Sequence, residues 1–159
     1  MTNIRKGVSM RIIIDGDACP VKEIIIEEAM AVPIPVLMIS SYSHYTYREF
    51  PDQVQHIYVE SSAEATDFKI LQLATSSDIV VTQDYGLASL LLAKQGRILH
   101  HRGFEYTHHN IQSLLSRRYL NAKIRQKGGR TKGPSSLTNN EKERFRQLLQ
   151  SCIDDLTVE

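Results

Sequence analysis

The first two-thirds of the chain alternates short apolar runs with segments of helical periodicity. The run at 10–15 contains three consecutive isoleucines, which suit a central parallel strand that is buried on both faces. Further strands are predicted at 36–40, 55–59, 79–82 and 97–100, with helices at about 21–30, 61–75 and 85–94. Strands that alternate with helices form parallel sheets, because each helical crossover packs on a face of the sheet. We therefore expect a three-layer α/β domain with a mostly parallel five-stranded sheet and helices on both faces.

The last third of the chain has a different pattern. Apolar residues from about residue 111 are spaced for one helix face, and a stretch rich in Gly and Pro at 128–134 then interrupts them. Thr138 with Glu141 has the spacing of a capping box before a final helix, as Ser61 with Glu64 has before the helix at 61–75. We divide the chain into an N-terminal extension (1–9), an α/β core (10–105) and a basic helical C-terminal extension (106–159) packed on the core.

The length and the cysteine content limit the class of protein. The 159 residues are the size of one ordinary domain. Its two cysteines, Cys19 and Cys152, form no CxxC pair, which argues against a disulfide scaffold and a zinc site. No apolar run approaches the length of a membrane-spanning helix, and the first nine residues lack the apolar segment of a signal peptide. We expect a cytoplasmic protein that makes no membrane contact.

The charges are distributed unevenly along the chain. Residues 1–105 contain 9 Lys or Arg and 13 Asp or Glu, whereas residues 106–140 contain 7 Lys or Arg and no acid. A basic segment beside an acidic body is the pattern expected when carboxylates hold cations and a separate surface binds phosphates. A solvated helix face is the alternative interpretation. The seven basic residues are Arg117, Arg118, Lys123, Arg125, Lys127, Arg130 and Lys132.

Several aspartates follow predicted strands. Asp15 closes the first strand, Asp17 lies two residues later, and Asp84 lies just past the fourth strand. Ligands of doubly wound sheets bind outside the carboxyl ends of the strands, so these acids meet if the first and fourth strands are neighbours. Asp67, in the first turns of the helix after the third strand, can reach the same place. Oxygen ligands suit Mg²⁺ or Mn²⁺, which would relieve the repulsion among the acids.

Each of these acids also has a local structural explanation. Asp17 suits the cap of a helix that starts at Pro20. Asp67 in a first helical turn is favoured by the helix dipole. Asp84 suits a turn after a strand. The structural interpretation suffices for any one of them alone, but it explains less well why all of them follow strands of one sheet.

Five separate blocks of sequence resemble the YaiI/YqxD family of uncharacterised proteins, which is assigned to the PIN-like nuclease superfamily. The blocks are Ile-Ile-Ile-Asp-Gly-Asp-Ala-Cys-Pro-Val-Lys at 12–22, Ala-Thr-Asp at 65–67, Ser-Asp-Ile-Val-Val-Thr-Gln-Asp at 77–84, the segment 102–111 and Thr-Lys-Gly-Pro at 131–134. Family members usually begin at the position of Met10. Two departures occur: Lys132 stands where the family has the first glycine of a Gly-Gly-Pro turn, and Asp67 is the last acid that remains of a Gly-Ala-Asp-Ala-Ala-Asp block.

The resemblance implies a nuclease. PIN-like domains have a parallel sheet with acids at the ends of strands one and four and on an intervening helix, and they cut RNA, or in some cases DNA, with Mg²⁺ or Mn²⁺. Carried over to this chain, the pattern implies Asp15, Asp67 and Asp84 as metal ligands and Asp17 as a helper that orients a ligand or binds through water.

Three further features would assist hydrolysis of phosphodiester bonds. Thr82 can place a hydroxyl in the same crevice, although a buried strand threonine is the simpler interpretation. Lys22 can meet a phosphate, although an exposed lysine is the default. The basic residues between 117 and 132 would hold the nucleic-acid backbone, so binding would weaken as salt increases.

Two other classes of function remain open. The Asp15-Gly-Asp17 sequence after a strand resembles the opening of haloacid-dehalogenase-type phosphatases, in which Asp15 would be the nucleophile and Asp17 the general acid. Against this, Cys19 stands where those enzymes usually have Thr or Val, and the chain is short for that fold with its cap. A non-catalytic RNA-binding module is the third possibility. In it, tyrosines at 42, 45 and 47 would stack bases, although packing of the loop against the domain is the simpler interpretation.

The histidines and cysteines favour structural roles. His100–His101 and His108–His109 are adjacent pairs, and adjacent side chains on a strand face opposite ways, so such a pair rarely shares a metal ion. Nearby carboxylates are expected to keep the Cys19 thiol unreactive. Cys152 is expected in the core, on the last helix.

Overall fold

The computed structural model describes residues 10–62, 64–131 and 135–157. Its centre is a six-stranded sheet with the strand order β3-β2-β1-β4-β5-β6. The strands are β1 (Ile12–Asp15), β2 (Val36–Ser41), β3 (Val54–Val59), β4 (Ile79–Val81), β5 (Arg97–His100) and β6 (Phe104–Glu105). The first five run parallel, which confirms the expectation, and β6 pairs antiparallel with β5. Two residues are too few to give β6 a recognisable sequence pattern.

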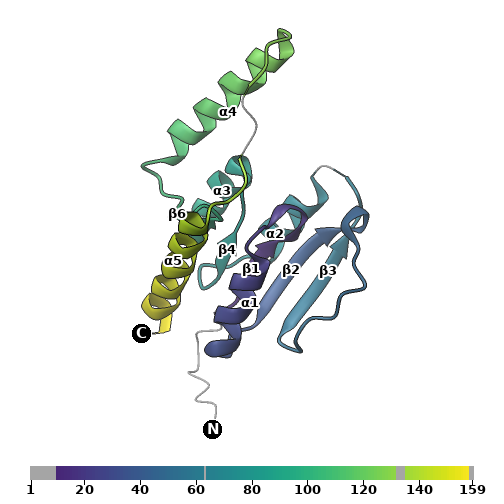
Figure 1. Cartoon of the computed structure of the whole chain (residues 1–159), viewed down its shortest axis with the longest axis vertical. Coiled ribbons are helices and arrows are strands. Elements are labelled where there is room, and N and C mark those ends of the chain that lie inside the picture. The colour runs from purple at the N-terminus through teal and green to yellow at the C-terminus, as the bar shows by residue number, and fades with distance from the viewer. Residues whose placement is uncertain (1–9, 63, 132–134, 158–159) are drawn as a thin grey trace.

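Helices connect the strands and cover both faces of the sheet. They are α1 (Lys22–Ala31), α2 (Ala65–Leu73), α3 (Tyr85–Leu92), α4 (Ile111–Gln126) and α5 (Asn139–Thr157), with single 3₁₀ turns η1 (Gly16–Ala18) and η2 (Tyr42–His44) after β1 and β2. The isoleucines of β1 explain the layers. Ile12 and Ile14 pack with α1 and α5, whereas Ile13 packs with α2 and α3, so the strand is buried on both faces. Figure 1 shows the resulting three-layer α/β arrangement.

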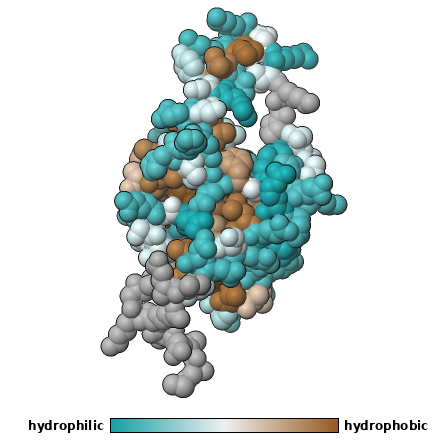
Figure 2. Space-filling view, turned by 90° about the vertical axis from the view of Figure 1, so that its left-hand side faces the viewer, coloured by the Kyte–Doolittle hydropathy of each residue, from teal (hydrophilic) through white to brown (hydrophobic). Residues whose placement is uncertain are grey.

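The two C-terminal helices differ in how they meet the core. α5 contributes Phe145, Leu149 and Cys152 to the apolar layer that it shares with α1, and all three are fully buried. The position expected for Cys152 is thereby confirmed. In α4 only Ile111 is buried, and most of the helix projects from the body (Figure 1). Figure 2 shows apolar atoms among hydrophilic ones at this projecting end, where Leu120 and Ile124 are exposed.

One of the two predicted capping boxes is present. The hydroxyl of Thr138 accepts a hydrogen bond from the Glu141 amide, and a carboxylate oxygen of Glu141 accepts one from the Thr138 amide, as predicted. The prediction for Ser61 and Glu64 is wrong. α2 begins only at Ala65, Glu64 is its N-cap residue without a side-chain cap, and the Ser61 hydroxyl accepts a hydrogen bond from the Ser43 amide instead.

The histidine pairs behave differently from each other. His100 and His101 are both buried, and their ring centroids lie 4.3 Å apart. The expectation that this pair faces opposite ways is wrong, because β5 ends at His100 and His101 stands in the following turn. The structural role is supported by the ring of Phe104, which stacks on His100 at 4.6 Å. His108 and His109 are exposed.

Within the part of the chain that the structure describes, no helix combines the length and the apolar character that crossing a membrane requires.

Candidate active site

Asp15 and Thr82 join the ends of the two central strands. β1 lies between β2 and β4, so the carboxyl ends of β1 and β4 are neighbours, as the site hypothesis required. The hydroxyl of Thr82 donates to Oδ2 of Asp15 at 2.8 Å and accepts the amide hydrogen of Asp84 at 3.0 Å. Thr82 is buried and does not line the cavity described below, and its hydroxyl orients Asp15.

Asp84 has both a structural role and a place in the site. Its Oδ1 accepts a hydrogen bond from the Leu87 amide at 3.0 Å, which makes Asp84 the side-chain N-cap of α3. Nη1 of Arg118 lies 3.5 Å from the same oxygen. The sequence predicts two possible roles for Asp84, a turn residue or a metal ligand. As a cap, its carboxylate is held at the carboxyl end of β4 by the start of the helix that follows.

The carboxyl groups of Asp15 and Asp67 are shifted towards the protonated form. Burial raises the pKa of Asp15 to about 6, against the opposing effect of the hydrogen bond from Thr82. Burial, the charges of Asp84 and Asp15, and a hydrogen bond with Asp84 raise the pKa of Asp67 to about 6. The acids from β1, α2 and α3 are therefore close enough to repel one another, although they are far apart in the chain.

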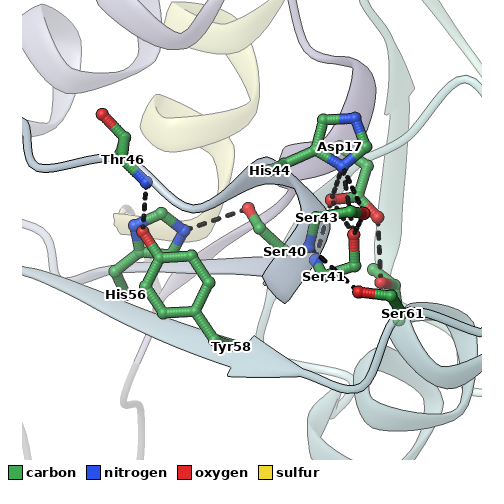
Figure 3. Close-up of polar contacts among 10 residues, drawn as sticks. Asp17, Ser40, Ser41, Ser43, His44, Thr46, His56, Tyr58 and Ser61 are labelled. Carbon is green, nitrogen blue, oxygen red and sulfur yellow. Dashed lines mark hydrogen bonds and ion pairs between the residues drawn. The ribbon is translucent and has the colours of Figure 1, made fainter.

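Asp17 is held by a polar network at the ends of β1 and β2 (Figure 3). Its Oδ1 accepts the Ser41 amide hydrogen at 2.8 Å and lies 3.2 Å from Nδ1 of His44. Its Oδ2 accepts the hydroxyl hydrogen of Thr66 at 3.1 Å. The expectation that Asp17 caps the following helix is wrong, because α1 begins at Lys22 and its N-cap, Val21, has no side-chain cap. Asp17 instead ties η1 to β2, η2 and α2.

One cavity of about 610 Å³ collects these acids opposite a basic helix face. Asp15, Asp17, Asp67 and Asp84 line it, together with Arg117, Arg118, Asn121 and Arg125 of α4. In α4 the spacing of four residues from 117 to 121 to 125 places these side chains on one helix face. The remaining lining residues are Ala18, Thr66, Gln83 and Tyr85.

The other predicted phosphate-binding residues lie outside the lining of this cavity. Lys123 is exposed near the end of α4, Lys127 is exposed directly after the helix, and Arg130 is exposed in the segment that follows. Lys22 is half-buried at the start of α1. Lys132 lies outside the described residues.

The acids offer the donor chemistry of a hard divalent cation. Oxygen-only ligands suit Mg²⁺ or Mn²⁺. Burial is the main cause of the raised pKa values of Asp15 and Asp67, and the charges of the neighbouring aspartates add to it. Among residues 10–62, 64–131 and 135–157, however, no three His, Cys, Asp or Glu side chains are grouped closely enough to hold a metal ion. The donor set thus fits such an ion, while the side chains do not already form its coordination sphere.

Comparison with known proteins places the chain in a family. The family described as "Uncharacterized BCR, YaiI/YqxD family" matches residues 13–155. This chain belongs to the YaiI/YqxD family. Among the similar relatives of this YaiI/YqxD protein is a "UPF0178 protein" of Bacillus anthracis (strain CDC 684 / NRRL 3495), 54% identical over 144 residues, which are 91% of this chain and 99% of the relative. A UPF0178 protein of Bacillus cereus (strain G9842) is similar to the same extent. No solved structure gives a significant match.

Sequence reasoning missed Ala18, Gln83 and Tyr85 of the cavity lining and four further residues in or beside the site. Asn121 is signalled only by helical spacing, because it lies four residues from both Arg117 and Arg125. Thr66 precedes Asp67 and donates to Asp17. Ser41 and His44 contact Asp17 through the fold alone, and no local pattern marks them.

The thiol of Cys19, in the same region, has a raised pKa, and burial rather than the nearby carboxylates is the main cause. Burial raises its pKa to about 12, with a smaller contribution from the charge of Asp15.

Proposed function

We propose that this protein is a metal-dependent nuclease of the PIN-like type that hydrolyses phosphodiester bonds of RNA. The observation that carries the proposal is the single cavity in which four aspartates face three arginines of α4. Carboxylates suit the cation that such hydrolysis uses, and guanidinium groups suit the phosphate oxygens of the substrate. The arginines are not placed there by pairing with the acids, because among the described residues Arg118 is the only one of the three that makes an ion pair with one of the four aspartates.

In the proposed site Asp15, Asp67 and Asp84 hold Mg²⁺ or Mn²⁺. The chemistry that such an ion supplies when bound is activation of water and neutralisation of charge on the phosphate. Thr82 keeps Asp15 directed at the site through its hydrogen bond. Arg117 and Arg125 bind the phosphate backbone, and Arg118 exchanges its contact with Asp84 for the substrate.

The phosphatase alternative is less well supported. It needs Asp17 as a general acid that releases a proton. Both carboxylate oxygens of Asp17 are already occupied, because Oδ1 accepts the Ser41 amide hydrogen and Oδ2 accepts the Thr66 hydroxyl hydrogen. A cytoplasmic location also forms part of the proposal, because Cys19 and Cys152 are free thiols.

Cleavage of a labelled single-stranded oligoribonucleotide tests the proposal. We expect the wild-type protein to cleave it with Mn²⁺ or Mg²⁺ and not with EDTA. Asp15→Asn and Asp84→Asn should each reduce the rate by about a hundredfold or more, as loss of a group that holds or orients a metal does. Both variants should fold, because Asn still accepts the hydrogen bond from Thr82 or caps α3.

Asp52→Asn is the matched control, because Asp52 is exposed near the start of β3, at the opposite edge of the sheet. It should cleave as the wild type does. Absence of metal-dependent cleavage, or cleavage that survives both site substitutions, would overturn the proposal. A phosphoaspartate trapped on Asp15 would favour the phosphatase instead, and RNA binding without cleavage would favour the binding module. Cleavage of a DNA strand of the same sequence, measured in parallel, shows whether the enzyme prefers RNA or DNA.

A further inference from the structure

A second hollow of about 570 Å³ lies between α2 and α3. These two helices pack on the same face of the sheet (Figure 1). Its apolar lining consists of Phe68 and Leu71 from α2 and Leu87 and Leu90 from α3. Glu64 and Ser89 add polar groups. We call this hollow the α2–α3 groove.

The α2–α3 groove is continuous with the acidic cavity. Asp67, Asp84 and Arg118 line both of them. Two of these residues are proposed metal ligands and the third is a proposed phosphate contact. A molecule whose phosphate lies in the acidic cavity can therefore place its adjoining part in the groove.

Two large apolar side chains border the groove without being used by the core. Phe68 is 66% exposed and Leu90 is 56% exposed. Phe68 directly follows Asp67 in α2, and both residues line the groove. An aromatic face together with an aliphatic side chain and a few polar groups is a common lining for a planar ligand.

We propose that the α2–α3 groove binds a nucleobase next to the scissile phosphate, with the ring of Phe68 stacked on that base. The proposal rests on the nuclease function and specifies its substrate class. A base in a duplex is stacked and paired, so only a single-stranded or locally unpaired nucleotide can enter the groove. The site therefore selects unpaired RNA, and any base can be accepted because every base has a stacking face.

Binding in EDTA tests the groove independently of cleavage. The probes are a labelled oligouridylate and a strand of equal length that lacks all bases. For the wild type we expect weaker binding of the abasic strand. Phe68→Ala should weaken binding of the oligouridylate about tenfold, within the range for loss of one base–aromatic stack, and leave binding of the abasic strand unchanged. Phe68→Tyr keeps the ring and should restore binding.

Tyr47→Ala is the matched control, since it removes an aromatic ring that is 92% exposed and does not line the groove. It should bind both strands as the wild type does. With Mn²⁺, Phe68→Ala should raise KM about tenfold and leave kcat within about twofold, since the ring binds the substrate and its transition state equally.

The outcomes separate the two proposals. Wild-type cleavage with no effect of Phe68→Ala on binding overturns the groove assignment and leaves the nuclease function standing. Equal weakening of both strands by Phe68→Ala also overturns the stacking role, because the abasic strand has nothing to stack. Stacking-dependent binding without any cleavage supports the groove and overturns the nuclease. If the variant no longer shows the melting transition of the wild type, Phe68→Leu replaces it.

Discussion

The hydroxyl of Thr82 donates a hydrogen bond to Oδ2 of Asp15 at 2.8 Å, from one central strand to the other. Thr82 lies two residues before Asp84 and also accepts its amide hydrogen. A single side chain thus sets the positions of two carboxylates that belong to different strand ends. The geometry of the proposed metal ligands depends on this buried hydroxyl.

Thr82→Val should change the titration of Asp15. The substitution removes the donor that lowers the pKa of Asp15, so this pKa should rise further above about 6. It also leaves the Asp84 amide without its acceptor and should cost about 1–2 kcal/mol of unfolding free energy. Carboxyl ¹³C NMR measures the first effect and urea denaturation the second. Thr82→Ser keeps the hydroxyl and is the control; an unchanged pKa in Thr82→Val would contradict the assigned role.

The free energy of unfolding of the metal-free protein should depend on pH through the protonation of Asp15. Its pKa of about 6 in the folded state lies above the ordinary 3.8, so the folded protein binds this proton more tightly than the unfolded chain. The stabilisation by the proton is complete below the lower value and is lost as the pH rises through the higher one. Asp15→Asn lacks this loss. Its stability relative to the wild type should increase by about 1–3 kcal/mol between pH 4 and pH 7, at about 1.4 kcal/mol per pKa unit.

Urea denaturation in EDTA across that pH range measures the difference. A difference between Asp15→Asn and the wild type that stays constant with pH would show that the carboxyl group has the same affinity for protons in both states.

The salt dependence of RNA binding should identify the phosphate contacts. Each phosphate contacted in a single strand contributes about −0.7 to the slope of log affinity against log salt concentration. Arg117→Ala and Arg125→Ala, whose side chains line the acidic cavity, should each make the slope less steep by about that amount. Lys142→Ala, at an exposed position of α5 outside the lining, should leave the slope unchanged. Slopes that are identical in all variants would exclude α4 as the phosphate-binding surface.

Arg11 and Asp78 form an ion pair near the amino end of β4. Asp78 is 0% exposed, accepts two hydrogen bonds from the Arg11 guanidinium and accepts the Thr75 amide hydrogen. Arg11→Met should therefore cost about 3 kcal/mol of unfolding free energy, because it leaves the carboxylate buried without its cation. Asp52→Asn, at an exposed acid, should cost less than about 0.5 kcal/mol. Equal losses in the two variants by urea denaturation would refute the importance of the pair.

Two glycines with positive φ distinguish backbone strain from crowding. Gly103 has φ +93° and a Cβ there would lie 2.9 Å from the Phe145 amide nitrogen, whereas Gly128 has φ +80° and no atom within 4 Å of such a Cβ. Gly128→Ala should cost about 1 kcal/mol for the backbone conformation alone. Gly103→Ala should cost about 3 kcal/mol, since the clash with α5 is added. Thermal melting compares them, and equal shifts would contradict the crowding.

The local pattern of the chain determined most of the fold. Three isoleucines in succession predict a strand buried on both faces, and Ile12 to Ile14 do contribute to both apolar layers. The rule that ligands bind at the carboxyl ends of parallel strands brought Asp15 and Asp84 together without knowledge of any contact. These predictions succeeded because periodicity and strand order depend on short-range sequence and on general packing rules.

Contacts between distant segments were decided only by the tertiary structure. Asp17 binds Ser41 and Thr66 instead of capping a helix, because the end of β2 and the start of α2 supply donors that no local pattern reveals. The same holds for the arginines of α4. The sequence shows that this segment is basic, but not that its arginines line a cavity with the acids. The direction in which α4 leaves the core is not encoded in the composition of that helix. A sequence pattern determines which face of an element is apolar or charged, whereas the packing of the whole chain determines what that face meets.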